Sequence, residues 1–455
     1  MCIADTTDRR TYYPRRRCTS RDSMTQDEDP SLRRILTFPQ VVISGIGIIL
    51  GAGVYALIGE AAATAGNALW ISFILAALIA SFTGLSYMEL SSMFPTASAE
   101  YEYSRRPFGE TVAFIIGIMV ILSGVVGAAT VALGFAGYFS AWTGAPALPV
   151  AVGLLLVLCI ILLIGIRQSV IVAIIFTVIE AGGIIGIIII GLPYIGSVDY
   201  FVAPQGFPGI FAAAALIFFA YQGFEEMVKL SDETIQPEKT IPAALLAAII
   251  ITIILYIAVS ISVVSIGGYE MIAGSPNPFA EIAGQAFSGG NLLFTIIALF
   301  ATANTALLMM MASSRILYGM GKKKTLPAVI AYVHPGQRTP VVAIVGATIV
   351  SMLFLLPGNI RDVALIANFT LFVTFIVINA AVIRLRKTMP DTPRPYRVPG
   401  AIRNVPVPAV LGIATCVFFL FQIDLPVIVI GIFLMIGAAI IGWVLRRRAG
   451  SPDKI

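Results

Sequence analysis

Two acidic residues lie inside long apolar stretches of this chain, where a carboxylate has few partners. They are Glu180 and Glu225, and Glu225 directly follows the Gly-containing residues 219–224. An ionised acid at the centre of a bilayer costs about 2.5–3.5 kcal/mol on insertion scales, so each acid is a functional candidate. The alternative for both is a protonated or paired acid that only supports the fold.

Three small residues, Gly51, Ala52 and Gly53, interrupt the first apolar stretch close to Ile49. Gly is a poor helix former and adopts backbone angles that other residues avoid. We therefore expect an unwound turn, and a membrane tolerates its unpaired N–H and C=O groups only where they line a cavity or bind something. The amides at the start of the next half-helix suit a carboxylate, and the carbonyls around Ile49 suit an ammonium group.

A second interruption lies in the middle of the chain, between Phe219 and Glu225. The carbonyls of Phe219, Ala220 and Gln222 also suit an ammonium group. Two Gly-interrupted helices in corresponding halves of a membrane protein indicate a binding site at the bilayer midplane. Amides and carbonyls together complement a zwitterionic α-amino acid. Alternatively, the glycines only allow helices to pack closely.

The elements that position these residues must be membrane helices, because 58% of the 455 residues are hydrophobic and only 12% are charged. Soluble domains carry about 25% charged residues. Long apolar stretches indicate helices rather than a β-barrel, whose strands alternate over about ten residues. One His and four scattered Cys offer neither a metal-ligand cluster nor a disulfide framework. The pI near 9.0 could suggest a nucleic-acid partner, but the placement of the charges explains it better.

We expect an all-α integral membrane protein with twelve transmembrane helices, since a hydrocarbon core needs about 20 residues per helix. The expected spans are 38–58, 67–93, 109–140, 147–165, 168–192, 208–229, 240–267, 291–317, 339–356, 361–386, 407–423 and 426–445. Residues 1–35 are expected to form a disordered cytoplasmic tail, 389–406 a Pro-rich cytoplasmic linker and 447–455 a C-terminal cytoplasmic tail.

The distribution of Lys and Arg predicts the orientation. With twelve spans, these residues gather on one side of the membrane, for example at Arg105, Lys322 and Arg446, and Arg361 alone lies on the other side. This asymmetry predicts that both termini lie in the cytoplasm. We also expect a multi-pass protein of the plasma membrane.

Two further expectations concern the connections. The longest external loop is predicted between residues 268 and 290, with a short surface helix over 279–287. Glu89, near the cytoplasmic end of its helix, is interpreted as an interfacial residue or a gate partner.

Several short motifs are specific through their combined order and spacing. They are Ile49-Leu50-Gly51-Ala52-Gly53-Val54-Tyr55, Tyr87-Met88-Glu89-Leu90, Phe219-Ala220-Tyr221-Gln222-Gly223-Phe224-Glu225, Gln236-Pro237-Glu238-Lys239-Thr240-Ile241-Pro242, Ser314-Arg315-Ile316-Leu317-Tyr318-Gly319-Met320 and Pro393-Arg394-Pro395-Tyr396-Arg397-Val398-Pro399. Through these motifs, residues 45–399 resemble the amino acid–polyamine–organocation superfamily of secondary transporters, and most closely its cationic-amino-acid-transporter-like branch.

The resemblance implies a LeuT-like five-plus-five inverted repeat. Residues 36–200 and 206–388 would form the two repeats, and residues 407–446 would add two helices. It also implies amino acid transport by alternating access rather than an enzyme. The expected partners are a small amino acid and the lipid bilayer, without a cofactor or a metal, and the sequence does not determine the oligomeric state.

The resemblance further assigns roles by position. Gly51–Gly53 would bind the substrate carboxylate, Phe219 would be an aromatic lid above the substrate, and Glu225 would lie near a gate. Two alternatives remain open at this point: a carrier of the same fold for polyamines or other organic cations, and a sensor that binds an amino acid without moving it. The small residues around Gly127 favour neutral substrates over cationic ones.

Glu180 departs from the resemblance, because the branch commonly has Lys at this position. We expect Glu180 to be the coupling residue, close to the polar side chains Thr302 and Thr305. Removal of water disfavours the ionised form of the Glu180 carboxyl. Glu180 could then take up and release a proton during the transport cycle, which would make transport proton-coupled. Sodium is the alternative coupling ion, because oxygen ligands suit a hard cation.

Overall fold

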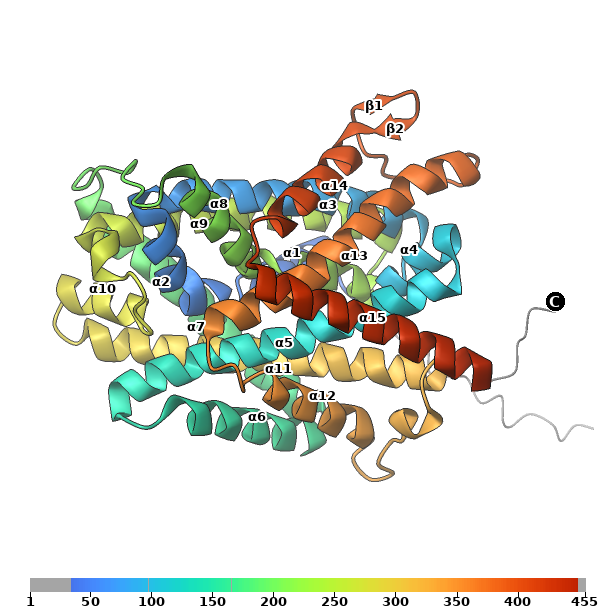
Figure 1. Ribbon diagram of the computed structural model, residues 1–455, viewed down its shortest axis with the longest axis horizontal. Coiled ribbons are helices and arrows are strands. Elements are labelled where there is room, and N and C mark those ends of the chain that lie inside the picture. The colour runs from blue at the N-terminus through green and yellow to red at the C-terminus, as the bar shows by residue number, and fades with distance from the viewer. Residues whose placement is uncertain (1–33, 97, 165, 449–455) are drawn as a thin grey trace, which may run out of the picture. The chain divides into compact units, whose positions relative to one another are not determined.

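The computed structural model describes residues 34–96, 98–164 and 166–448 (Figure 1). Most of the expected N-terminal tail and residues 449–455 of the expected C-terminal tail lie outside the described residues. The described part is almost entirely helical.

The helices follow one another along the chain with short connections. The first group is α1 (Phe38–Ile49), α2 (Gly53–Ala65), α3 (Leu69–Met93), α4 (Ala99–Phe108), α5 (Glu110–Thr143), α6 (Ala147–Ile164) and α7 (Ile166–Gly191). The second group is α8 (Gly206–Ile217), α9 (Pro237–Gly267), α10 (Pro278–Ala286), α11 (Gly290–Lys322), α12 (Val341–Leu353), α13 (Ile360–Thr388), α14 (Val407–Leu420) and α15 (Leu425–Arg448). Short 3-10 helices lie between them, including η1 (Gly66–Ala68), η3 (Phe218–Tyr221) and η4 (Phe224–Glu233).

The lengths and compositions of these helices confirm a helical integral membrane protein. Among the described residues, nine helical stretches are long and apolar enough to cross a membrane. Three shorter apolar helices, α1, α12 and α14, have 12, 13 and 14 residues.

The structure corrects four details of the sequence-based expectations. The first expected span, 38–58, ends too early, because its second helix continues to Ala65. A two-stranded antiparallel sheet, β1 (Ala401–Ile402) with β2 (Val405–Pro406), lies in the expected linker, so the fold is not purely α-helical. Helix α4 was not predicted, because its charged sequence has no apolar stretch. Helix α15 continues through Arg448, so the expected tail begins inside a helix.

The expected short helix in the longest external loop is present as α10. Its predicted bounds, 279–287, differ by one residue from the observed Pro278–Ala286. It is not a purely surface helix, because Phe279 and Ile282 on it are buried. The ring of Phe279 packs edge-on against Tyr55 with a centroid distance of 4.7 Å, which places α10 directly over α2.

Helix α5 lies at the centre of the helix packing, against α11 and α13 (Figure 1). Its small residues allow this close approach, as small residues commonly do between membrane helices. A Cβ added at Gly124 would lie 2.1 Å from Ser313 Oγ, and one added at Gly127 would lie 2.7 Å from Met309 Sδ. Both partners lie on α11, so larger residues on this face of α5 would push the two helices apart.

A buried ion pair joins the end of α3 to the end of α13. Arg386 Nε donates to Glu89 Oε1 over 2.9 Å, and Arg386 Nη2 donates to Oε2 of the same carboxylate. The amide of Val398 also donates to Glu89 Oε2, at 2.8 Å, which fastens the linker to the same point. Glu89 is thus a buried, ion-paired carboxylate, because only 1% of it is exposed.

We predict that Glu89→Gln lowers the free energy of unfolding by about 3–5 kcal/mol, because the substitution leaves the Arg386 guanidinium buried without a carboxylate. Thermal unfolding of the purified protein in detergent measures this change. The matched control is Glu270→Gln at an exposed position, which we expect to alter stability by less than about 0.5 kcal/mol. Equal unfolding midpoints for the two variants would contradict the structural role of the ion pair.

Candidate functional site

The first predicted helix interruption is present. Helix α1 ends at Ile49, α2 begins at Gly53, and residues 50–52 between them are not helical. The first amides of α2 have no acceptor within their own helix, as at every helix start. This break therefore leaves several polar backbone groups among apolar side chains.

The second predicted interruption is also present. Helix α8 ends at Ile217, the chain tightens into η3, and Gly223 separates η3 from η4. Gly223 has a φ of 118°, which side chains rarely allow, and a Cβ there would lie 2.8 Å from the carbonyl oxygen of Ile48. Glycine is required at this position both by its backbone angle and by the close approach of α1.

The two interruptions lie against each other. A Cβ added at Gly53 would be 2.7 Å from Ala220 Cα and 3.1 Å from Phe219 Cδ1. Backbone from the start of α2 therefore touches backbone of η3, although the two segments are more than 150 residues apart in sequence. The arrangement agrees with the expectation that Gly51–Gly53 and Phe219–Gln222 belong to one site.

Tyr256 on α9 links the two interruptions through one hydroxyl group. Its hydroxyl is 2.8 Å from the carbonyl oxygen of Ile49 and 2.9 Å from that of Ala220. Tyr256 is completely buried, and its ring packs against Tyr221 with a centroid distance of 5.1 Å. The carbonyl of Ile49 at the end of α1 and the carbonyl of Ala220 in η3 thus share one donor, which comes from α9 and not from either broken helix.

Side chains from two more helices bind the remaining backbone groups. The amide of Ala52 donates to Thr305 Oγ1 on α11 at 2.8 Å. Asn368 Nδ2 on α13 donates to the carbonyls of Ala215 and Leu216 at 2.7 and 3.1 Å, close to the end of α8. The breaks are therefore held open by specific hydrogen bonds rather than by glycine alone.

These bonds correct part of the expected ligand chemistry. The Ala52 amide already has a protein partner, so it is not free for a carboxylate. The carbonyls of Ile49 and Ala220 share the single hydrogen of the Tyr256 hydroxyl, and each of them keeps a lone pair that can accept a further hydrogen bond. Within the described residues, the Gly51 amide has no hydrogen-bond partner. The side-chain nitrogen of Gln222 is also buried without a partner.

Phe219 lies beside the first break and against α5. A Cβ at Gly127 would be 3.6 Å from Phe219 Cε2, and the one at Gly53 meets the opposite part of the same ring. Phe219 is 2% exposed. It thus fills the space between the start of α2 and Gly127 on α5.

Glu180 is buried on α7 next to α11. Its Oε2 accepts a hydrogen bond of 3.4 Å from Asn304 Nδ2, and its Oε1 has no partner among the described residues. Its backbone carbonyl accepts a bond of 2.7 Å from the hydroxyl of Tyr55, the third residue of α2. Glu180 therefore lies one hydrogen bond away from the helix that starts at the first break.

The other expected coupling and gating residues have local partners. Glu225 Oε2 accepts a 3.0 Å bond from the amide of Gly223, so this acid caps the second break. The Thr302 hydroxyl donates to carbonyls of its own helix, those of Ala298 and Leu299. Of the two threonines expected near Glu180, Thr305 contacts the first break and Thr302 makes its hydrogen bonds within α11.

Tyr256 and Asn368 are contributors to the breaks that were not predicted from the sequence. The signal was present, because both are polar groups inside long apolar helices, α9 and α13. Polar residues at such positions are hydrogen-bonded and commonly functional. Their partners lie 36 to 207 residues away in sequence, so the pattern alone could not connect them to the breaks.

Comparisons with known proteins add the following findings. A family model described as amino acid permease matches residues 36–447. The branched-chain amino acid permease BcaP of Bacillus subtilis is 31% identical over 439 residues, which cover 90% of this chain and 93% of the relative. The methylthioribose transporter of Bacillus subtilis is also 31% identical and covers 88% of this chain and 90% of the relative. A vacuolar cationic amino acid transporter 2 of Arabidopsis thaliana is 28% identical, with 80% and 62% covered.

We predict that Tyr256→Phe lowers the free energy of unfolding by about 1–3 kcal/mol, because two buried carbonyls lose their shared donor. Thermal unfolding in detergent measures the effect. Tyr318→Phe is the matched control, since the Tyr318 hydroxyl makes no hydrogen bond to the described residues. A destabilisation of equal size in both variants would show that the shared hydroxyl of Tyr256 has no special role.

Proposed function

Because the chain belongs to the amino acid permease family, it is an amino acid transporter rather than an enzyme, and we propose that it works as a secondary active carrier by alternating access. The observation that carries this proposal is the contact between the two helix breaks at Gly53 and Ala220. A carrier needs a site that two groups of helices can open to either side. Two broken helices that touch at their unwound turns provide such a site.

We propose twelve transmembrane spans in a five-plus-five inverted repeat. Residues 53–93 cannot form one span, since 41 helical residues would be about 62 Å long and the hydrocarbon core is about 30 Å thick. In this proposal α1 with α2 forms the first span, α3 the second, and α8 with η4 the sixth. The interrupted first helix of each half supports the repeat.

The proposed orientation places both termini in the cytoplasm of a cell with this protein in its plasma membrane. The support is the gathering of Lys and Arg on the side of Arg105, Lys322 and the three arginines that end α15. The cation on the opposite side, Arg361, has an acidic neighbour, because its Nη2 lies 3.6 Å from Asp424 Oδ2.

The proposed substrate is a neutral α-amino acid with an apolar side chain. The Gly51 amide would bind its carboxylate, and Gln222 could provide a further polar contact from the second break. The side chain would lie toward Phe219 and Gly127, where small and apolar groups predominate. The branched-chain amino acid permease among the relatives supports the same class.

We further propose that Glu180 couples transport to protons. Its buried carboxyl has one oxygen without a partner and the other at 3.4 Å from an amide, a setting that an uncharged carboxyl accommodates better than a carboxylate. The bond from the Tyr55 hydroxyl to the backbone carbonyl of Glu180 places this carboxyl next to α2, where a change of its charge would act. Thr302 and Thr305 would support this region from α11, and Glu225 would act at the gate by stabilising the second break.

Radiolabelled uptake into proteoliposomes tests the function directly. The panel contains neutral, cationic and anionic amino acids, a polyamine and methylthioribose, because one relative is named for the last compound. We impose pH and sodium gradients separately. Accumulation of neutral amino acids driven by a pH gradient is the expected result. Uptake of a polyamine alone, or binding without any flux, would replace the proposal by an organic-cation carrier or a sensor.

We predict that Gly53→Ala weakens binding of the preferred amino acid about fivefold or more. The methyl group would meet backbone atoms of Ala220, and overpacking of this kind costs about 1–3 kcal/mol, where 1.4 kcal/mol is a factor of ten. Equilibrium binding of labelled substrate measures the effect. Gly346→Ala is the matched control, because a Cβ there meets nothing within 4 Å. Wild-type affinity in Gly53→Ala would remove the helix breaks from the site.

We predict that Glu180→Gln loses gradient-driven accumulation and retains exchange of labelled for unlabelled amino acid. Gln is nearly the same size and can still accept the bond from Asn304, but it cannot gain or lose a proton. Exchange and accumulation are measured in the same proteoliposomes, with Glu270→Gln as the control. If Glu180→Gln still concentrates substrate with the pH dependence of the wild type, Glu180 only supports the packing of α7 on α11.

A further inference from the structure

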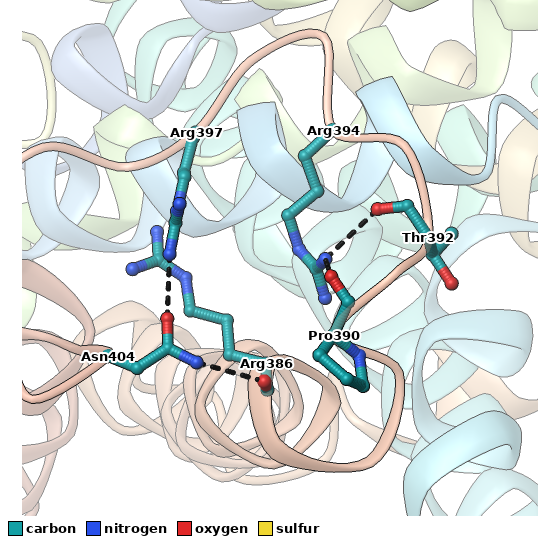
Figure 2. A pocket seen from close by; sticks show the side chains of 6 residues that line it. All are labelled: Arg386, Pro390, Thr392, Arg394, Arg397 and Asn404. Carbon is teal, nitrogen blue, oxygen red and sulfur yellow. Dashed lines mark hydrogen bonds between the residues drawn. The ribbon is translucent and has the colours of Figure 1, made fainter.

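A cavity of about 250 Å³ lies at the end of α13, away from the two helix breaks (Figure 2). The residues that line it come from α13, the linker and the turn of the β-hairpin. They are Arg386, Pro390, Thr392, Arg394, Arg397 and Asn404. Three of the six are arginines, so the cavity has a strongly basic lining.

The positive charge around this cavity exceeds the negative charge. Among the described residues, Glu89 is the carboxylate that forms ion pairs with these arginines, through Arg386 and through Arg394 at 3.3 Å. Arg397 has no carboxylate partner within the described residues and donates instead to Asn404 Oδ1 at 2.7 Å. Two of the three guanidinium groups thus share one carboxylate in ion pairs, and Arg397 has none in the part of the chain that the structure describes.

Arg386 retains an unused donor. Its side chain is 1% exposed and lines the cavity, and its Nη1 has no hydrogen-bond partner among the described residues. A buried donor of a charged group without an acceptor costs more than about 1–3 kcal/mol, so such groups normally have a partner. The Glu89 carboxylate faces the Nε and Nη2 edge of the guanidinium, where Nη2 also donates to the carbonyl of Val398, and Nη1 lies outside these contacts.

The linker holds Arg394 in place through its backbone. Arg394 donates to the carbonyls of Leu385, Met389 and Thr392 over 2.9–3.0 Å, which fixes its guanidinium beside the cavity, as Figure 2 shows for Thr392. Burial lowers the pKa of Arg394, and the nearby charges of Arg386 and Arg397 lower it further against the opposing effect of Glu89. An anion in the cavity would relieve this repulsion.

We propose that this cavity is an anion site that binds a phosphate group through Arg386, Arg397 and Asn404. Guanidinium groups present planar sets of donors that match phosphate oxygens. The volume is below the about 300–1,000 Å³ of pockets for drug-sized ligands, so a small headgroup or a free ion fits and a large metabolite does not.

The phosphate can come from the headgroup of an anionic phospholipid or from soluble phosphate. On the orientation proposed above, the cavity faces the cytoplasmic surface, where basic pockets at helix ends bind lipid headgroups. In both cases the bound group would join the linker and the hairpin turn to the end of α13. The site is separate from the substrate site and can be tested without transport.

The test uses thermal unfolding of the full-length protein in a neutral detergent. One arm compares sodium phosphate with sodium chloride at equal ionic strength. The other arm compares mixed micelles that contain phosphatidic acid with micelles that contain phosphatidylcholine. The variant is Arg397→Gln, which leaves the Glu89–Arg386 ion pair intact. The control is Lys387→Gln, which removes the same charge from an exposed neighbouring residue that does not line the cavity.

The anion is expected to raise the unfolding midpoint of the wild type and of Lys387→Gln, with an apparent affinity about tenfold weaker in Arg397→Gln because one charged hydrogen bond is lost. Protection in the phosphate arm assigns the site to soluble phosphate. Protection by phosphatidic acid alone assigns it to the membrane. No protection in either arm, or equal behaviour of Arg397→Gln and Lys387→Gln, overturns the proposal.

Discussion

The whole arrangement depends on one constraint: polar backbone groups freed by an unwound turn need partners where there is no water. This chain breaks two helices and supplies partners from others. Tyr256 on α9 serves Ile49 and Ala220, and Asn368 on α13 serves the end of α8. The helices around the breaks are therefore tied to them by hydrogen bonds as well as by apolar packing, and their positions are determined by the same few side chains.

The close contact between the two breaks explains why residues larger than glycine do not fit at positions 53 and 223. Glycine at position 53 allows η3 to approach, and glycine at position 223 allows α1 to approach. The polar bonds set the distance between the segments, and the missing side chains make that distance possible. The small residues of α5 extend this region of close packing to Met309 on α11.

Sequence reasoning predicted those features that are encoded locally. The two breaks, the apolar helices and α10 follow from glycine placement, hydrophobic stretches and a Pro-containing turn, all within short windows. The partners of the breaks and of Glu89 could not be predicted, because Arg386 lies 297 residues from Glu89 and Tyr256 lies 207 residues from Ile49. Helix α4 could not be predicted because its sequence contains no apolar stretch. Residues such as Tyr103 are buried on it only through contacts with other helices.

The contact between Gly53 and Ala220 has a consequence for kinetics. A ligand that touches both breaks can occupy its place only after the two segments have separated, so binding is coupled to a prior opening of the protein. The apparent dissociation constant then equals the intrinsic constant divided by the fraction of molecules that are open. Association would be slower than diffusional encounter, and changes remote from the two breaks that ease the opening would strengthen binding without adding a single contact to the ligand.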